Sequence, residues 1–349
     1  MKIPIFPVVL FGGMVALLLI NAVFIVPVNF NMPVQYFDVI SDFSKFVVVF
    51  LYFIIGYQIE RLDWTGKLFR SFILGAVIIG IIGLLVSWIW IPLLSDRMWY
   101  AGIRLNGWMN DPNYYAVVQC IALVTVLRIE EFKRLRKLLL IALLLLTIIS
   151  SGSKTGFLTI AAVMMFFVWH EWLDQRLGMK HLLSFTFLLL IGLILTPPFL
   201  QNMSEVFDFI GQYIPSVQRI ELLLSNFSSA ISEDGSGRTE VWDLAVQLIK
   251  SSPLIGVSVG NYYHLGKRLH PDPNVAHNTF LQLFAEWGIP ITCLLLIFLI
   301  FLILRKPKKS TDKRARAIQQ ALLIFSVSSM SVSFNNSRLF WLIIGIASA

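Results

Sequence analysis

Arg238 combines a phosphate-binding side chain with a favourable place in a predicted helix. It follows Ser236-Gly237 and opens the stretch RTEVWDLAVQLIK, whose apolar residues recur at helical spacing over residues 238–250. Arginine binds phosphate oxygens through a bidentate fork, and the backbone N–H groups of a helix N-terminus also favour an anion. Arg238 is therefore a candidate phosphate ligand; the alternative is a solvated or headgroup-facing surface charge.

His277 is a candidate base at the start of another predicted helix, after the turn-rich segment Pro271-Asp-Pro-Asn274. The helix dipole disfavours imidazolium at this end, so we expect a neutral ring that can accept a proton from a hydroxyl nucleophile. The alternative is a histidine that only donates hydrogen bonds. Glu286 lies further along the same helix, about 14 Å deep, where a carboxylate is costly and usually paired or functional. It could pair with an outer Arg or Lys, and the alternative is a protonated structural acid.

The composition indicates that these residues are positioned by helices in a membrane. Of the 349 residues, 57% are hydrophobic and 14% are charged, with a mean hydropathy of +0.77. Soluble domains carry about 25% charged residues. Here the apolar residues also come in long blocks instead of amphipathic stripes, which favours lipid as the solvent. The two cysteines, Cys120 and Cys293, lie in apolar runs and predict neither a metal site nor a disulfide framework.

Uncharged runs long enough, or nearly long enough, to cross a bilayer lie at residues 3–28, 46–59, 71–95, 112–127, 138–153, 155–169, 182–204, 287–304 and 317–337. A last run, 339–349, would rise about 17 Å and is a candidate half-span. The first is expected to be a retained helix, because no small-residue cleavage site follows it. We therefore predict an all-α polytopic membrane protein with about ten transmembrane helices. A large, partly helical extracytoplasmic loop precedes the C-terminal helices.

The predicted organisation has three parts and a defined orientation. An N-terminal bundle of about seven helices covers residues 1–196, the loop domain covers 197–276, and the C-terminal helices cover 277–349. With the N-terminus in the cytoplasm, 18 of the 28 Lys and Arg residues fall on the cytoplasmic side and five on short outer segments. This bias agrees with the positive-inside rule, so the net charge of +8 predicts contact with membrane lipids and no nucleic-acid partner.

The unusual polar segments all fall on the predicted outer side, although the topology argument did not use them. They are Asn106–Asn113, Ser150–Gly156, Ser236–Arg238, His277-Asn278 and Asn335–Arg338. The outer basic residues include Arg97, Arg104, Lys154, Arg238, Lys267, Arg268 and Arg338. Several cations converging at an outer membrane surface would suit a diphosphate on a lipid carrier.

A family resemblance is carried by segments in a fixed order: Asn110–Asn113, Ser151–Gly156, Ser236-Gly-Arg238, Pro253–Gly260, Ala276-His-Asn278 and Glu286-Trp-Gly288. Their order, spacing and predicted outward topology resemble the shared domain of bacterial O-antigen ligases and of O-antigen or exopolysaccharide polymerases. The resemblance covers about residues 105–300. Ligase and polymerase are not separable from this one sequence.

The resemblance implies an inverting glycosyl transfer, without metal or cofactor, at the outer face of the bacterial cytoplasmic membrane. The implied donor is a glycan on undecaprenyl diphosphate, and the acceptor is lipid A–core oligosaccharide or another lipid-linked glycan. A chain-length regulator is an expected partner of a polymerase. By position, Arg238 would bind the diphosphate and His277 would activate the acceptor. Lys154 and Arg338 would help to bind the diphosphate, with support from Asn113, Asn278 and Glu286.

Two departures and two rival functions accompany this interpretation. Family members often place arginine in the segment that corresponds to Ser153-Lys-Thr155, whereas Lys154 supplies a charge without the bidentate fork. The chain is also shorter than many members, which affects the helix count.

A transporter or flippase of lipid-linked glycans is the first rival, but no internal repeat is visible in the sequence. A structural membrane subunit with a solvated loop is the second.

Overall fold

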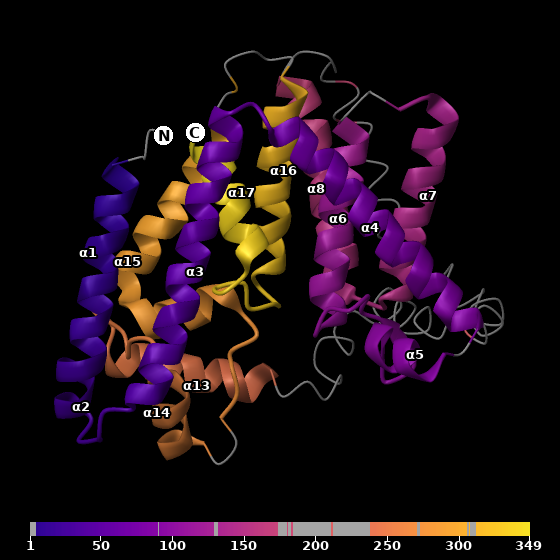
Figure 1. Cartoon of the computed structure of the whole chain (residues 1–349). Coiled ribbons are helices and arrows are strands. Elements are labelled where there is room, and N and C mark those ends of the chain that lie inside the picture. Colours follow the sequence, from indigo (N-terminus) through magenta and orange to yellow (C-terminus); the bar gives the residue numbers. More distant parts are fainter. Residues whose placement is uncertain are drawn as a thin grey trace. The chain divides into compact units, whose positions relative to one another are not determined.

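The computed structural model of the chain describes residues 5–89, 91–128, 132–173, 238–270, 273–305, 307 and 312–349, together with Lys180, Leu183 and Gly211. Over these residues the protein is mostly helical, with one short hairpin (Figure 1). The chain folds into two compact units, each assembled from distant segments. Unit 1 holds Met1–Trp64, Gly237–Arg305 and Ser329–Ala349, and unit 2 holds Thr65–Ser236 and Lys306–Ser328. The division into 1–196, 197–276 and 277–349 stays a prediction.

Unit 1 is built on long apolar helices with shorter helices at one end. Its elements are α1 (Ile5–Ile20), the π-helix η1 (Asn21–Ile25), α2 (Val26–Asn29), α3 (Tyr36–Arg61), α13 (Arg238–Ser251), α14 (Tyr262–Leu269), α15 (Thr279–Leu304) and α17 (Arg338–Ser348). Figure 1 shows α13 and α14 at the end of the unit where α15 begins. The predicted helix over 238–250 is confirmed as α13, with Leu244, Ala245 and Leu248 on its buried face.

The contact between α3 and α17 depends on a glycine in each helix. A Cβ atom added to Gly345 would collide with the carbonyl oxygen of Phe53, and one added to Gly56 would collide with that of Leu342. Both collisions involve backbone atoms, which cannot rotate away as a side chain would. Small residues allow helix backbones to approach this closely in membrane proteins.

Gly345→Ala is therefore expected to destabilise the protein by about 1–3 kcal/mol or more, because the added methyl group forces the two backbones apart. A lower midpoint of thermal unfolding in detergent would measure this effect. Gly13→Ala in α1 is the matched control, since nothing lies within 4 Å of an added Cβ there. Equal midpoints for the two variants would contradict the proposed close contact.

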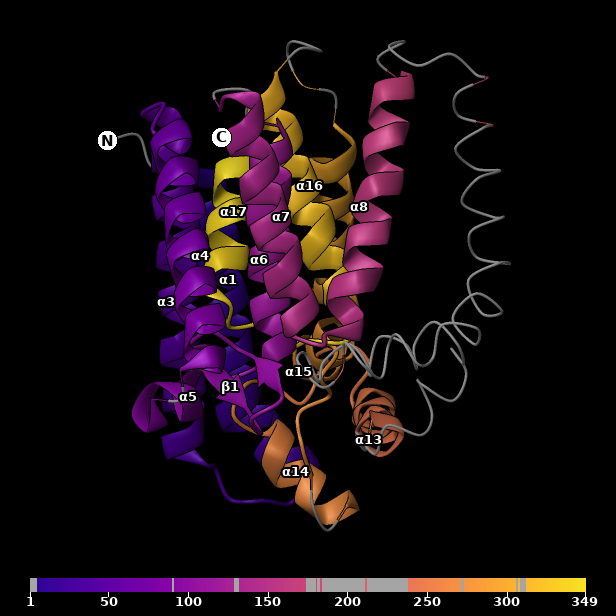
Figure 2. The ribbon, with the colours of Figure 1, turned by 90° about the vertical axis from the view of Figure 1, so that its right-hand side faces the viewer.

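Unit 2 surrounds one buried helix. Its elements are α4 (Thr65–Trp88), α5 (Pro92–Met98), β1 (Trp99–Tyr100), β2 (Arg104–Leu105), α6 (Pro112–Arg128), α7 (Arg134–Ser150), α8 (Lys154–Leu173) and α16 (Lys313–Ser328). Almost every residue of α6 is buried, and α4, α7, α8 and α16 pack around it. Figure 2 shows α6, α7, α8 and α16 running alongside one another. The strands form an antiparallel hairpin in which Trp99 pairs with Leu105 and Tyr100 with Arg104.

The described residues contain four helical segments long and apolar enough to cross a membrane: Pro7–Asn29, Tyr36–Arg61, Thr65–Ser87 and Thr279–Leu304. The prediction of about ten spans is not confirmed. Helices α6, α7 and α16 have 17, 17 and 16 residues. At 1.5 Å per residue they rise about 24–26 Å, less than a hydrocarbon core of about 30 Å. Apart from Leu183, the predicted run 182–204 lies outside the described residues.

The predicted span 317–337 is wrong in its second half. Helix α16 ends at Ser328, and residues 329–337 are not helical. The helix ends at Ser328 because backbone groups in residues 329–337 bond to the polar side chain of Thr279 instead of continuing the helix. Thr279 Oγ1 donates to the carbonyl of Val332 at 2.7 Å and accepts from the N–H of Phe334 at 2.8 Å.

Candidate functional site

His277 has a left-handed backbone conformation in the turn that precedes α15. Its φ angle is 46°, a value that few non-glycine residues adopt and that costs about 1–3 kcal/mol. The next residue, Asn278, caps α15: its side-chain oxygen accepts from the N–H groups of Phe280 at 3.0 Å and Leu281 at 3.1 Å. The cap occupies N–H groups that the first turn of a helix leaves without a partner. The predicted place of His277 at the helix start is confirmed.

Two hydrogen bonds hold the backbone of Ala276, the residue before His277. The indole Nε1 of Trp242 donates to the Ala276 carbonyl at 2.9 Å, and the Ala276 N–H donates to the side-chain oxygen of Gln282 at 3.1 Å. Trp242 lies four residues after Arg238, on the same side of α13. The helix that begins with Arg238 is therefore tied directly to the segment that carries His277.

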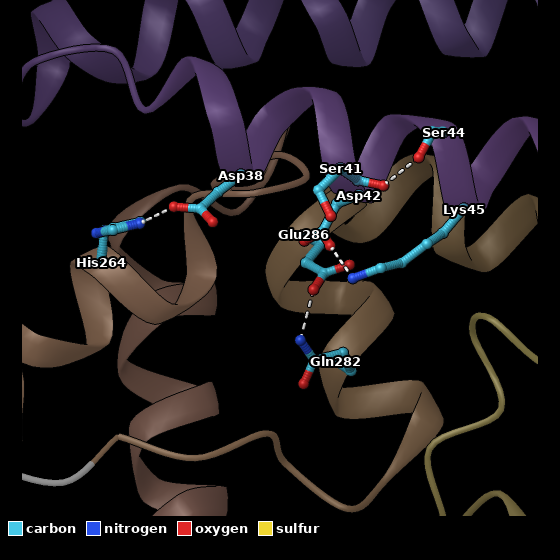
Figure 3. Close-up of polar contacts among 8 residues, drawn as sticks. All are labelled: Asp38, Ser41, Asp42, Ser44, Lys45, His264, Gln282 and Glu286. Atoms are coloured by element: carbon cyan, nitrogen blue, oxygen red, sulfur yellow. Dashed lines mark hydrogen bonds and ion pairs between the residues drawn. The ribbon is translucent and has the colours of Figure 1, made fainter.

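Glu286 belongs to the same network through Gln282. The Gln282 amide donates to the Glu286 carboxylate at 2.5 Å, and the Glu286 residue is only 8% exposed (Figure 3). A chain of contacts thus runs from Glu286 through Gln282 to the backbone beside His277. Asn278 and Glu286, which the sequence suggests as supporting residues, both lie in unit 1. Asn278 caps α15, and Glu286 lies within that helix.

Helix α15 is broken just after Glu286. Gly288 has φ 78° and ψ 168°, and Pro290 follows it. Such a break exposes backbone groups that a regular helix would pair internally. The segment 253–258 occupies them: Val257 and Ser258 donate their N–H groups to the carbonyls of Ala285 at 2.8 Å and Glu286 at 2.9 Å.

The segment 253–258 is also anchored from the opposite side. Ile289 N–H donates to the Pro253 carbonyl at 2.8 Å. The Asn21 side chain of the π-helix donates to the Ile255 carbonyl at 2.8 Å, and Ser258 Oγ donates to the carbonyl of Leu18 in α1 at 2.6 Å. The segment is therefore hydrogen-bonded on one side to α15 and on the other to α1 and the π-helix, and its residues Gly256, Val257 and Ser258 are buried.

Arg338 lies in unit 1, directly after the non-helical segment that precedes α17. Thr279, the first residue of α15, donates its N–H to the carbonyl of Ser329 at 2.8 Å. This bond joins the start of α15 to the segment that leads to Arg338. Ser337 caps α17 by accepting from the Phe340 N–H at 3.3 Å, and Arg338 is exposed on the first turn.

In unit 2, two polar segments far apart in sequence meet around Asn113. Its side-chain oxygen accepts from Arg104 Nη2 at 3.0 Å and from Ser153 Oγ at 2.9 Å. Arg104 Nε also donates to the Ser151 carbonyl at 2.9 Å. Lys154, the first residue of α8, follows directly. The turn between α7 and α8, with Lys154 at its end, is thus fixed against Asn113 and Arg104.

Comparison with known families identifies the long central segment. Residues 138–296 match the family model described as O-antigen ligase. This segment, somewhat less than half of the chain, is similar to the O-antigen ligase family, and the match supports an assignment to the O-antigen ligases and polymerases. A search of curated proteins gave no match. The family supports a membrane protein that transfers glycans in surface-polysaccharide biosynthesis.

The segment matched to the O-antigen ligase family contains some of the predicted site residues and omits others. Lys154, Arg238, His277, Asn278 and Glu286 lie inside residues 138–296, whereas Asn113 and Arg338 lie outside them. The matched segment also crosses both compact units. The prediction that one diphosphate recruits Lys154 together with Arg238 and Arg338 stays a prediction. The role of the Arg238 side chain as a diphosphate ligand also stays a prediction, because this side chain lies outside the described part of the chain.

Sequence reasoning missed three organising residues. Trp242 and Gln282 each hold Ala276, and Arg104 links Asn113 to the turn before Lys154. In the sequence, Trp242 is only one residue of the predicted helix over 238–250, and Gln282 follows the predicted helix start without an assigned role. The sequence places Arg104 only among the outer basic residues. No residue near Arg104 in the sequence indicates that its guanidinium bonds to the turn at Ser151, 47 residues away.

Among the described residues, no group of three or more His, Cys, Asp or Glu side chains lies close enough to hold a metal ion. The expected absence of a metal or cofactor stays a prediction of the family resemblance. The basic side chains, together with the N-terminus of α13, are instead the groups that could stabilise negative charge.

Proposed function

We propose that this protein transfers a glycan from undecaprenyl diphosphate to a sugar hydroxyl at the outer face of the cytoplasmic membrane. The acceptor is lipid A–core oligosaccharide in a ligase or another lipid-linked glycan in a polymerase. The observation that carries the proposal is the O-antigen ligase match over residues 138–296, which spans both Arg238 and His277. The hydrogen bond from Trp242 to Ala276 supports it, because it couples these two positions.

In this proposal the neutral His277 ring accepts the proton of the acceptor hydroxyl as its oxygen attacks the anomeric carbon. The bond from that carbon to the diphosphate oxygen breaks, and the negative charge stays on the lipid diphosphate. Arg238 stabilises this charge, with Lys154 and Arg338 as further cations. Attack from the face opposite the leaving group inverts the anomeric configuration.

The strained backbone of His277 suits a base that must keep one orientation. The Asn278 cap and the two hydrogen bonds on Ala276 fix the peptide groups on both sides of it. Preorganisation of this kind lowers the cost of positioning the acceptor and the base for reaction. The conformation at His277 is thus better explained by orientation of a reacting group than by helix capping, which Asn278 already supplies.

The break in helix α15 would also fit the rival transporter function, since transporters often bind substrate at such breaks. Here the Ala285 and Glu286 carbonyls accept from Val257 and Ser258, and Ile289 N–H donates to Pro253. These exposed groups are therefore used internally by the protein, which favours a structural role for the break.

The purified protein, reconstituted with a lipid-diphosphate-linked glycan and an acceptor, is expected to form the transferred glycan and release lipid diphosphate. Activity is expected to persist in EDTA, because cationic side chains take the place of a metal in this proposal. Product analysis by gel and mass spectrometry would measure both results. Absence of transfer with ligase and polymerase acceptors alike would refute the function. Activity lost in EDTA and restored by a divalent ion would refute the metal-free mechanism alone.

A further inference from the structure

The indole ring of Trp242 in α13 is fixed at one edge and open to its surroundings elsewhere. Its Nε1 donates to the Ala276 carbonyl at 2.9 Å, yet the residue is 36% exposed. Trp287 and Trp341 of the same unit are only 2% and 6% exposed, as is usual for so large an apolar side chain. Trp242 therefore presents apolar ring surface in an orientation that a hydrogen bond has already set.

The packing of α13 does not explain why an apolar ring is exposed at this position. The buried face of α13 belongs to a hydrophobic core that it shares with α14 and α15, and Trp242 is not part of that core. Val275, the residue before Ala276, is also exposed. Isolated exposed apolar residues are common on protein surfaces. These two, however, both adjoin Ala276, and hence the segment that carries His277.

Trp242 lies between the two positions to which the proposed chemistry assigns the diphosphate and the base. It follows Arg238 by four residues, or about 6 Å along α13. Its indole contacts the carbonyl of Ala276, directly before His277. In the donor, the reacting anomeric carbon belongs to the sugar that is bonded to the diphosphate. A donor whose diphosphate is bound at Arg238 and whose anomeric carbon faces His277 therefore places this first sugar beside Trp242.

The chemistry of the indole suits a sugar ring better than a phosphate. A sugar ring carries hydroxyl groups around its rim and apolar C–H groups on its faces, and contact with an aromatic ring removes such a face from water. Tryptophan supplies a large, rigid contact surface at a low cost in conformational entropy. The hydrogen bond to Ala276 lowers that cost further, because the ring is oriented before the ligand arrives. The ring bears no charge with which to attract a phosphate.

We propose that Trp242 is a sugar-binding residue that packs against the first sugar of the lipid-diphosphate-linked donor. The inference rests on the proposed glycan transfer and deepens it, because it assigns a residue to the sugar, whereas Arg238 is assigned to the diphosphate. Transfer removes this sugar from the lipid. The contact with Trp242 is then lost, so the protein distinguishes the glycan-bearing donor from the lipid diphosphate that the reaction releases.

Equilibrium binding to the unmodified protein in detergent is the first test, and it needs no variant. The probes are undecaprenyl diphosphate and the same lipid carrying only the first sugar of the host's own precursor. The single sugar is expected to strengthen binding by about tenfold, the effect of placing one ring face against an indole. Equal affinities for the two lipids would overturn the proposal.

Two substitutions separate the indole ring from its N–H group. Trp242→Phe keeps an aromatic surface but cannot donate to Ala276, whereas Trp242→Gln keeps an amide donor but removes the ring. Trp242→Gln is expected to abolish the advantage of the sugar-bearing lipid and to leave the binding of undecaprenyl diphosphate unchanged. Trp242→Phe is expected to retain most of that advantage. Trp64→Gln is the matched control, since Trp64 is 52% exposed and follows the end of α3 that is remote from α14.

Steady-state kinetics distinguishes a sugar contact from a purely positioning role of the indole. The proposal expects Trp242→Gln to raise KM for the donor by more than Trp242→Phe does. A lower kcat in both variants with an unchanged donor KM would mean that Trp242 only holds Ala276, and would overturn the proposal. A raised KM for the acceptor alone would place the ring against the acceptor, and would overturn it as well.

The binding measurements do not need turnover, so the two proposals can fail separately. If the protein prefers the sugar-bearing lipid through Trp242 but transfers nothing to any acceptor, the transfer function is refuted and the sugar contact stands. If transfer proceeds while Trp242→Gln still prefers the sugar-bearing lipid like the unmodified protein, the sugar contact is refuted and the transfer function stands.

Discussion

Replacement of His277 by asparagine is expected to lower the rate of glycan transfer by about 10²–10⁴-fold, the usual contribution of a general base. Asparagine is the informative substitute because His277 has a φ angle of 46°. Asparagine tolerates this left-handed conformation better than most residues, so the backbone between Ala276 and Asn278 should be preserved. The amide cannot accept the proton of the acceptor hydroxyl. The loss should therefore appear in kcat, with little change in the midpoint of thermal unfolding.

His270→Asn is the matched control for this experiment. His270 follows α14, and its ring lies 3.7 Å from the Glu240 carboxylate, an exposed pair of the kind that contributes little stability. Transfer by this variant should remain close to that of the unmodified protein. A His277→Asn variant that is folded and fully active would rule out His277 as the base. The alternative, a histidine that only donates hydrogen bonds, would then be the correct interpretation.

Removal of the Arg238 guanidinium is expected to produce the second largest loss. Arg238→Gln should lower kcat/KM by about 10²–10³-fold, as for the loss of one group that stabilises developing negative charge. Arg238→Lys should recover only part of this activity, because lysine keeps the charge but lacks the bidentate fork. The position at the first residue of α13 supports this role, since the N–H groups of a helix N-terminus add to the attraction.

Lys250→Gln removes a charge from the other end of the same helix and serves as the control. Lys250 is exposed in the last turn of α13, where a cation only complements the helix dipole. Its loss should change transfer little. The substrate for both variants is the lipid-diphosphate-linked glycan, with binding of the sugar-free lipid diphosphate measured in parallel. If Arg238→Gln binds the lipid diphosphate and transfers glycan normally, Arg238 is not a diphosphate ligand.

Local features of the chain were predictable from the sequence because their causes are local. The apolar spacing of 238–250 predicts the buried face of α13, and the burial of Leu244 and Leu248 confirms it. His277 was predicted at the mouth of a helix, and α15 begins two residues later with Asn278 as its cap. Capping and helical periodicity depend on residues within about one turn of each other.

The helix count was less predictable, because hydropathy measures apolar length and not helix length. Residues 317–337 form one uncharged run in the sequence, but the helix stops at Ser328. The hydrogen bonds between Thr279 and residues 329–334 compete with continuation of the helix. No rule based on a window of neighbouring residues includes a partner about 50 positions earlier.

The sequence by itself determined an apolar helical protein, the place of Arg238 and His277 at two helix starts, and the resemblance to a glycan-transferring family. Only the tertiary structure decided that Trp242 and Gln282 hold the backbone beside His277, and that segment 253–258 fills the break in α15. It also brought Asp42 of α3 to the same pocket as Glu286. The physical reason is that a helix satisfies its backbone locally, whereas exposed backbone groups and buried polar side chains need partners. Which distant segment supplies those partners is set by packing.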